Sequence, residues 1–351
     1  MSLVVPILIT LILLVGIVWA CSIFTNAIEW LGHRLQLSQG AVGSVLAAVG
    51  TALPETLVPV VALVGGHFAA ALNPAMGVAI RQQAADIGVG AILGAPFLLS
   101  TLAMCLAGVA VFYGAWRGKR SWKLHLDEGL FKRDLSYFFL AYVLVFAATM
   151  IQSQVVKWTL AVLLLCFYGL YVYRTLKMEH VPDAEFDLEP LTLAPRSKEP
   201  PTWLIGLQTL MGLLGILILA HLFVEQIKHL SAMLQFSSLV LSLIIAPIAT
   251  ELPEKYNSIV WILKKKDNLA LGNITGAMVF QSCIPTAIGL SFTPWVLDFH
   301  GQLSVLLCFA SAGVIFLSVM YRRDLSPGVL LVGGVFYLIF LVHNVMEIVH
   351  R

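Results

Sequence analysis

Residues 35–55 read LQLSQGAVGSVLAAVGTALPE, and residues 234–254 of the same chain read LQFSSLVLSLIIAPIATELPE. The two stretches align without a gap, and both end in Thr-x-Leu-Pro-Glu. Similarity of this kind between distant parts of one chain indicates an internal repeat. The two halves of the protein are therefore expected to share one architecture.

Composition indicates the environment of this repeat. The 351 residues are 59% hydrophobic and only 11% charged, whereas soluble domains carry about 25% charged residues. A bilayer span needs about 20 apolar residues, so we expect an all-α integral membrane protein. Because residues 4–24 lack a preceding basic residue and a small-residue cleavage site, they are read as a span, not a signal peptide. The ten predicted transmembrane helices are 4–24, 39–65, 86–113, 135–152, 155–176, 203–225, 235–263, 269–291, 302–321 and 327–348.

Five spans per half is an odd number, so the second half enters the membrane from the opposite side, as in inverted-topology repeats. We expect a first five-helix repeat over 1–176, a proline-rich cytoplasmic linker over 177–201 and a second five-helix repeat over 202–351. Most of the 21 Lys and Arg residues fall in the loops on the linker side, which predicts both termini outside. The short loops favour a prokaryotic plasma membrane.

Each repeat places a glutamate, Glu55 or Glu254, inside an apolar span. An acidic side chain at mid-bilayer costs about 2.5–3.5 kcal/mol on insertion scales. Two carboxylates about 4 Å apart repel by roughly 4 kcal/mol at an effective dielectric near 20. A bound cation or a proton would offset both costs. The simpler alternative is two protonated glutamates that hold helices together by hydrogen bonds.

The residues beside the glutamates favour a cation. Pro54 and Pro253 cannot donate a backbone hydrogen bond, so each leaves a carbonyl four residues earlier without its helical partner. Freed carbonyls beside a carboxylate are hard oxygen ligands, suited to Na⁺, Ca²⁺ or Mg²⁺. The threonine of each motif lies four residues before the glutamate, on the same helix face. These expected neighbours are the carbonyls of Gly50 and Ala249 and the hydroxyls of Thr51 and Thr250.

The motifs GTALPE (50–55), ATELPE (249–254) and LALGNITG (269–276) resemble signatures of the cation/Ca²⁺ exchanger superfamily, in particular the sodium/calcium exchanger group. The resemblance implies two inverted five-helix repeats around a central cation site. It also implies alternating access, with Ca²⁺ exchanged for Na⁺ or H⁺. By position, Glu55 and Glu254 match ion-binding glutamates, Thr51 and Thr250 match neighbouring ligands, and Asn273 is expected to face the site.

The sequence also departs from the family pattern. The serines that follow the two threonines are Ala52 and Glu251, and the Asn/Asp ligands after the glycine motifs become Leu99 and Gln281. Three polar corners of the expected site remain: Glu55, Glu254 and Gln281. Because Ca²⁺ takes six to eight oxygens, a leucine corner implies fewer ions, added water or a different substrate.

Glu251 and Lys255 are additions to the pattern. They lie four residues apart, on one face of a helix. The simpler interpretation is a self-neutralising buried ion pair. The alternative hypothesis is that Lys255 takes the place of one coupling cation.

The function predicted from the sequence is secondary cation antiport, of Ca²⁺ against Na⁺ or H⁺. The alternative is a channel or ion-sensing membrane protein without tight exchange. No HExxH, GxSxG or phosphate-binding loop supports an enzyme, the five single cysteines form no metal or disulfide pattern, and nothing indicates nucleic-acid binding. The expected partners are small cations and the bilayer, with no cofactor besides the transported cations. The candidate metal-site residues are Glu55, Glu254, Thr51, Thr250, Gln281, Glu251, Gly50, Ala249 and Asn273.

Overall fold

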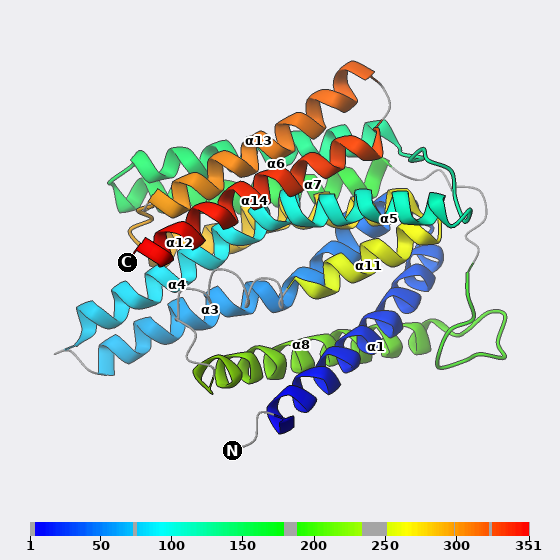
Figure 1. Cartoon of the computed structure of the whole chain (residues 1–351), viewed down its shortest axis with the longest axis horizontal. Helices are drawn as coiled ribbons and strands as arrows, with labels where there is room; N and C mark the ends of the chain where they lie inside the picture. Colours follow the sequence, from blue (N-terminus) through cyan, green and yellow to red (C-terminus); the bar gives the residue numbers. More distant parts are fainter. Residues whose placement is uncertain are drawn as a thin grey trace.

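The computed structural model describes residues 4–72, 76–178, 188–233, 251–297, 299–322 and 325–350. Within these ranges the regular structure is helical, as Figure 1 shows. Two segments, η1 and η2, are π-helical turns inside longer helices, and η3 is a 3₁₀ turn. The elements are α1 (Val4–Arg34), α2 (Gln39–Ala41), η1 (Val42–Ala47), α3 (Ala48–Leu72), α4 (Gly77–Leu98), η2 (Leu99–Ala103), α5 (Met104–Trp116), α6 (Glu128–Ala147), η3 (Ala148–Met150), α7 (Gln154–Met178), α8 (Thr202–Met233), α11 (Leu252–Leu263), α12 (Asp267–Phe292), α13 (Phe299–Arg322) and α14 (Pro327–His350).

Eight of the described helical segments are long and apolar enough to cross a membrane. They correspond to the predicted spans except 39–65 and 235–263. The first of these exceptions is the run α2–η1–α3, of which Gln39–Ala52 and Leu63–Leu72 are shorter apolar helices. The second is described only from residue 251 onward. The prediction of an all-helical membrane protein is therefore confirmed, and the count of ten spans stays a prediction.

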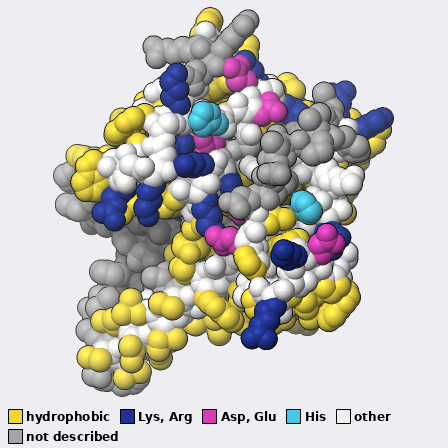
Figure 2. Space-filling model, turned by 90° about the vertical axis from the view of Figure 1, so that its right-hand side faces the viewer, with side chains coloured by type: hydrophobic (Ala, Val, Ile, Leu, Met, Phe, Trp, Pro, Cys, Tyr) yellow, Lys and Arg dark blue, Asp and Glu magenta, His cyan; other side chains and the backbone are white. Residues whose placement is uncertain are grey.

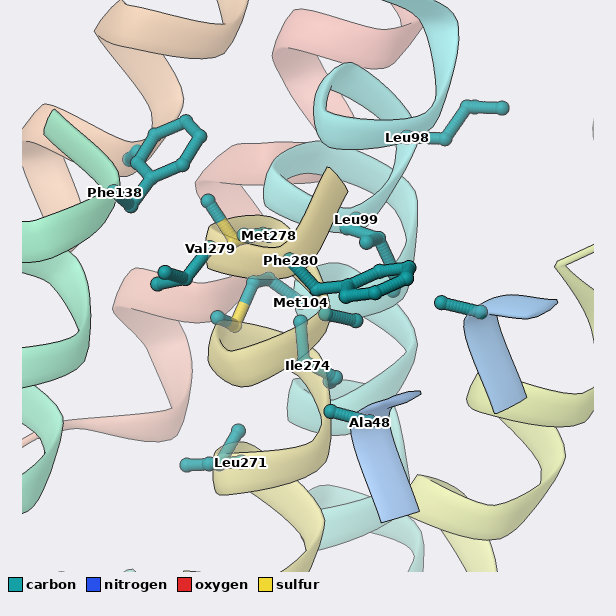
Figure 3. Packing of buried hydrophobic residues seen from close by; sticks show 14 of the residues in the cluster. Ala48, Leu98, Leu99, Met104, Phe138, Leu271, Ile274, Met278, Val279 and Phe280 are labelled. Carbon is teal, nitrogen blue, oxygen red and sulfur yellow. The ribbon is translucent and has the colours of Figure 1, made fainter. Parts of the chain in front are cut away.

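Helix α12 is the centre of the helix packing. Most of its residues are buried, whereas only about a quarter of the apolar stretch of α1, α7 or α8 is buried. It contacts η1, α3, α4, α6, α7 and α11, and its apolar side chains Leu271, Ile274, Met278 and Phe280 lie in the core (Figure 3). Polar residues placed on α12 are consequently shielded from lipid and can face residues of both halves of the chain.

Glycine allows α12 to approach η1 closely. A Cβ atom on Gly276 would lie 2.1 Å from the backbone oxygen of Ser44. This distance is too short for any side chain at that position. Gly43 faces α12 in the same way, since its Cβ would lie 2.5 Å from the Leu269 oxygen. The backbone of η1 is thereby held directly against α12.

Helices α1 and α8 form a separate antiparallel pair on one side of the molecule (Figure 1). Small residues again set the contact: a Cβ on Gly212 would lie 2.8 Å from the Phe24 backbone. The Phe24 ring also fills the space beside Gly50 on α3. The pair therefore touches the rest of the protein beside the Thr-x-Leu-Pro-Glu segment of α3.

The basic loops lie at one end of the molecule. Arg120, in the α5–α6 loop, makes two 2.8 Å hydrogen bonds to Asp267 at the start of α12. Lys266, from the α11–α12 loop, forms an ion pair with the buried Glu29 near the end of α1. Figure 2 shows this end, with many Lys and Arg side chains on it. The basic loops that the sequence places on one side of the membrane thus lie on one side of the structure.

The described part of the predicted linker, residues 188–201, is docked onto this same end. Asn26 on α1 accepts hydrogen bonds from the Thr192 amide at 3.0 Å and from Gln208 at 2.9 Å, and its amide donates to the Glu189 and Pro190 carbonyls. Leu191 is buried with Trp30 and Ile205 in a small apolar cluster. The sequence predicted an extended linker, and the structure adds that this portion is fixed to α1 and α8.

Substitution of Asn26 by alanine tests this anchor. Each lost hydrogen bond contributes about 0.5–1.5 kcal/mol, and about 1.4 kcal/mol changes a local opening equilibrium tenfold. We expect tryptic cleavage after Arg196 or Lys198 to become roughly tenfold faster. Thr10→Ala is the matched control, since among the described residues the Thr10 hydroxyl bonds within α1 alone, to the Pro6 carbonyl. Equal cleavage rates for Asn26→Ala and wild type would show that Asn26 does not hold the linker.

Candidate cation site

Glu55 on α3 and Gln281 on α12 meet in the interior. The Gln281 amide donates a hydrogen bond to Glu55 Oε2, and both side chains are buried. The other carboxylate oxygen, Glu55 Oε1, has no hydrogen-bond partner among the described residues. Two of the three polar corners predicted from the sequence are thus in direct contact.

The third corner, Glu254, lies in the first turn of α11. Pro253 is at the helix start, where its missing N–H is not needed. The helix N-terminus carries a partial positive charge that stabilises a nearby carboxylate. Glu254 is fully buried, and within the described residues neither of its carboxylate oxygens has a hydrogen-bond partner. It lies within electrostatic range of Glu55, and Thr51, one turn before Glu55 on α3, lies near its carboxyl group, so α3 and α11 bring the two glutamates into one region.

Glu251 and Lys255 join the same cluster. Lys255 Nζ lies 2.5 Å from Glu251 Oε2, with both side chains buried, so the pairing expected from their spacing is present. Both charges also interact with Glu55 and Glu254. Four ionisable groups consequently share one interior region.

Hydroxyl and amide groups connect α3, α11 and α12 around the carboxylates. The Thr51 hydroxyl, 3.3 Å from Asn273 Oδ1, also lies near the Glu254 carboxyl. The Asn273 amide donates to Ser258 Oγ at 3.2 Å and to the Glu254 carbonyl at 3.4 Å. Asn273 therefore lies beside Thr51, Ser258 and the Glu254 backbone and cross-links α3, α11 and α12.

The site retains oxygens for a cation. Within the described residues, Glu55 Oε1, Glu251 Oε1 and both oxygens of Glu254 are buried without a hydrogen-bond partner, as is the Asn257 amide. Buried polar groups are normally satisfied, and carboxylate oxygens are ligands for hard cations. No three His, Cys, Asp or Glu side chains in the described ranges are placed to hold a metal by themselves. Hydroxyl, amide or water oxygens would have to complete the shell.

Asn257 and Ser258 have different environments, although both follow Glu254 on α11. Ser258 donates to the Ala270 carbonyl and accepts from Asn273, so it serves helix packing. Asn257 is fully buried with no partner for either amide atom among the described residues. Because Asn257 lies three residues after Glu254, on an adjacent part of the helix surface, it is the better candidate for a further ligand.

The remaining sequence candidates divide into three groups. Thr250 and Ala249 lie outside the described residues. Gly50 is buried against the Phe24 ring, which gives this glycine a packing role besides the expected carbonyl. Leu99 begins η2 and is fully buried in the apolar core, pointing toward α12 (Figure 3). The Leu99 side chain thus places hydrocarbon where the family pattern has an Asn or Asp ligand.

Asp134 on α6 forms a second buried polar cluster that the sequence analysis missed. Its Oδ2 accepts hydrogen bonds from Ser44 at 2.6 Å and Thr275 at 2.9 Å, and Arg133 pairs with its Oδ1 at 3.2 Å. Ser44 and Thr275 come from η1 and α12, so Asp134 fastens the close contact between them. The signal was an acidic residue at the edge of a predicted span, but its partners are far away in sequence.

Removal of this clamp is expected to destabilise the fold. Asp134→Ala removes the acceptor that Arg133, Ser44 and Thr275 share, and loss of one member of a buried charged pair costs about 3–5 kcal/mol. Asp127→Ala on the same helix is the control, since its loss removes an exposed N-cap worth about 1 kcal/mol. The melting temperature in detergent should fall distinctly further for Asp134→Ala than for Asp127→Ala. Equal shifts would contradict the clamp.

The helical fold, the buried carboxylates and the oxygens without partners define a class: polytopic membrane proteins with a central acidic site. Residues 5–177 and 204–346 match the family described as sodium/calcium exchanger protein. The chain therefore belongs to the sodium/calcium exchanger family.

Individual proteins with a similar sequence or structure agree with this assignment. The chain is 26% identical to the putative antiporter CaxA of Alkalimonas amylolytica over 295 residues, which cover 82% of each chain. It is 25% identical to the inner membrane protein YrbG of Escherichia coli over 304 residues, 84% and 83% of the two chains. A structure of the sodium-calcium exchanger NCX_Mj has a TM-score of 0.73 and 19% identity, and the match covers 97% of this chain and 99% of that chain. The structural match shows the same fold.

Proposed function

We propose that this protein is a secondary cation antiporter that exchanges Ca²⁺ for Na⁺ or H⁺. The observation that carries the proposal is the placement of Glu55 and Glu254 within electrostatic range of each other in the interior, with carboxylate oxygens that have no hydrogen-bond partner among the described residues. Two carboxylates close together repel each other in a low-dielectric interior. A bound divalent cation would cancel that repulsion, so the geometry favours cation binding.

The proposed ligand set extends beyond the two glutamates. Gln281 and Glu251 contact the cluster directly, and Thr51 and Asn273 supply neutral oxygens beside it. The Thr250 hydroxyl and the Ala249 carbonyl are added to the set because they occupy the positions in the second motif that Thr51 and Gly50 occupy in the first. The proposed residues are Glu55, Glu254, Thr51, Thr250, Gln281, Glu251, Gly50, Ala249 and Asn273.

The proposed architecture is ten spans in two inverted five-helix repeats, 1–176 and 202–351, joined by a cytoplasmic linker over 177–201. Inverted repeats with a site between them support alternating access. The clustering of basic loops at one end of the molecule favours that end as cytoplasmic. Both termini would then face the outside of a prokaryotic plasma membrane.

Ca²⁺ uptake into proteoliposomes tests the function. The expected result is radioactive Ca²⁺ uptake driven by an outward Na⁺ or H⁺ gradient and abolished when an ionophore collapses that gradient. Glu128→Gln should transport like wild type, because Glu128 is a half-exposed surface carboxylate paired with Lys132. Ca²⁺ flux that ignores every counter-gradient would instead indicate a channel, and absence of flux under both gradients would contradict Ca²⁺ antiport.

A further inference from the structure

The candidate site contains a cation of its own. Lys255 Nζ lies 2.5 Å from Glu251 Oε2, both side chains are buried, and both charges lie within electrostatic range of Glu55 and Glu254. The pair is carried by one helix turn, with Glu251 just before α11 and Lys255 four residues later. The ammonium group is thus tethered inside the carboxylate cluster.

The position of Glu251 shows which side of the site this pair occupies. Glu251 interacts electrostatically with Tyr337 of α14, and the Tyr337 ring packs against Phe97 of α4 at 6.3 Å between centroids. The ion pair therefore lies toward α14 and α4.

The net formal charge of the cluster follows from its four ionisable groups. Glu55, Glu251 and Glu254 contribute three negative charges and Lys255 one positive charge, which leaves two negative charges. Residues 234–250, which are not described, contain no Asp, Glu, Lys, Arg or His and so do not change this sum. Buried charge is costly unless it is compensated, so two added positive charges would neutralise the site.

We propose that Lys255 is a resident cation that fixes the capacity of the site at two added positive charges. The site would then hold either one divalent cation or two monovalent cations, and exchange would be electroneutral. This inference rests on the proposed antiport and names its coupling ratio. In a self-neutralising pair outside the site, the charges of Lys255 and Glu251 would not affect how many ions bind. Here both charges count toward the net charge that the transported ions balance.

The test is the number of monovalent cations displaced by one Ca²⁺. This number is the slope of log apparent Ca²⁺ Kd against log concentration of the driving cation, measured on purified protein. We expect a slope of about 2 for wild type and for Lys255→Arg, which keeps the charge. Lys255→Gln adds one net negative charge and should raise the slope to about 3, whereas Glu251→Gln removes one and should lower it to about 1.

The double variant Glu251→Gln/Lys255→Gln restores the original sum and should return the slope to about 2. This variant also keeps the proposal testable if Lys255→Gln does not fold, since it leaves no buried charge unpaired at these two positions. A slope for Lys255→Gln or Glu251→Gln equal to that of wild type would overturn the proposal, as would a double variant that departs from 2.

A second readout uses wild-type proteoliposomes with a clamped membrane potential. One net charge per cycle would shift the equilibrium Ca²⁺ ratio roughly 50-fold per 100 mV; electroneutral exchange should shift it less than about twofold. A large shift would overturn the coupling ratio while leaving antiport established. Absence of any gradient-driven Ca²⁺ uptake would instead reject the proposed function, so the two failures are distinguishable.

Discussion

Replacement of Glu254 by glutamine is expected to abolish Ca²⁺ exchange. Glutamine keeps the size of the side chain but removes one charge from a buried cluster whose formal charge is two negative. The attraction between unit charges about 4 Å apart is roughly 4 kcal/mol at an effective dielectric near 20, and each 1.4 kcal/mol is tenfold in affinity. We therefore expect apparent Ca²⁺ affinity and the initial rate of uptake at low Ca²⁺ to fall at least about 100-fold.

The stability of the variant separates this effect from misfolding. In the absence of Ca²⁺, the Glu254 carboxyl is buried without a hydrogen-bond partner among the described residues, and the charges of Glu55 and Glu251 repel its own, a cost that the helix N-terminus and Lys255 offset only in part. Glu254→Gln should melt at the same or a higher temperature than wild type when no Ca²⁺ is present. Added Ca²⁺ should raise the melting temperature of wild type and of Glu128→Gln, but not of Glu254→Gln. Uptake by Glu254→Gln above a tenth of the wild-type rate would contradict a direct role in binding.

Substitution of Gly276 by alanine is expected to disrupt both the fold and the site. The new Cβ would lie 2.1 Å from the Ser44 oxygen and 2.5 Å from its Cα, and backbone atoms cannot move aside as a flexible side chain can. Helix α12 would have to separate from η1, which stretches the bonds of Asp134 to Ser44 and Thr275. Asn273, one turn earlier, would move away from Thr51 and lose the hydrogen bond between the two side chains.

Overpacking of this kind costs about 1–3 kcal/mol, or more where backbone is involved. We expect a clear drop in melting temperature and at least a tenfold fall in the uptake rate for Gly276→Ala. Gly169→Ala on α7 is the control, because a Cβ there meets nothing within 4 Å among the described residues. Wild-type uptake and stability in Gly276→Ala would show that η1 and α12 are not held in contact as described.

The sequence alone determined the helical membrane class, and it predicted a repeat relation between the two halves and two central glutamates. These properties follow from local signals: runs of about 20 apolar residues, a repeated motif, and the high cost of an acidic residue inside a span. The spacing of Glu251 and Lys255 likewise predicted their pairing, because residues four apart share a helix face.

Other features depended on contacts between residues far apart in the chain. The bond between Gln281 and Glu55, the clamp from Asp134 to Ser44 and Thr275, and the docking of the linker on Asn26 each join distant segments. The close approach that Gly276 allows is equally invisible in the sequence, where the glycine is one of 27. Hydropathy and periodicity decide which residues form helices and which faces avoid water. Only the packing of those helices decides which polar groups meet, since a buried polar group can be satisfied by any suitable partner that the fold brings within reach.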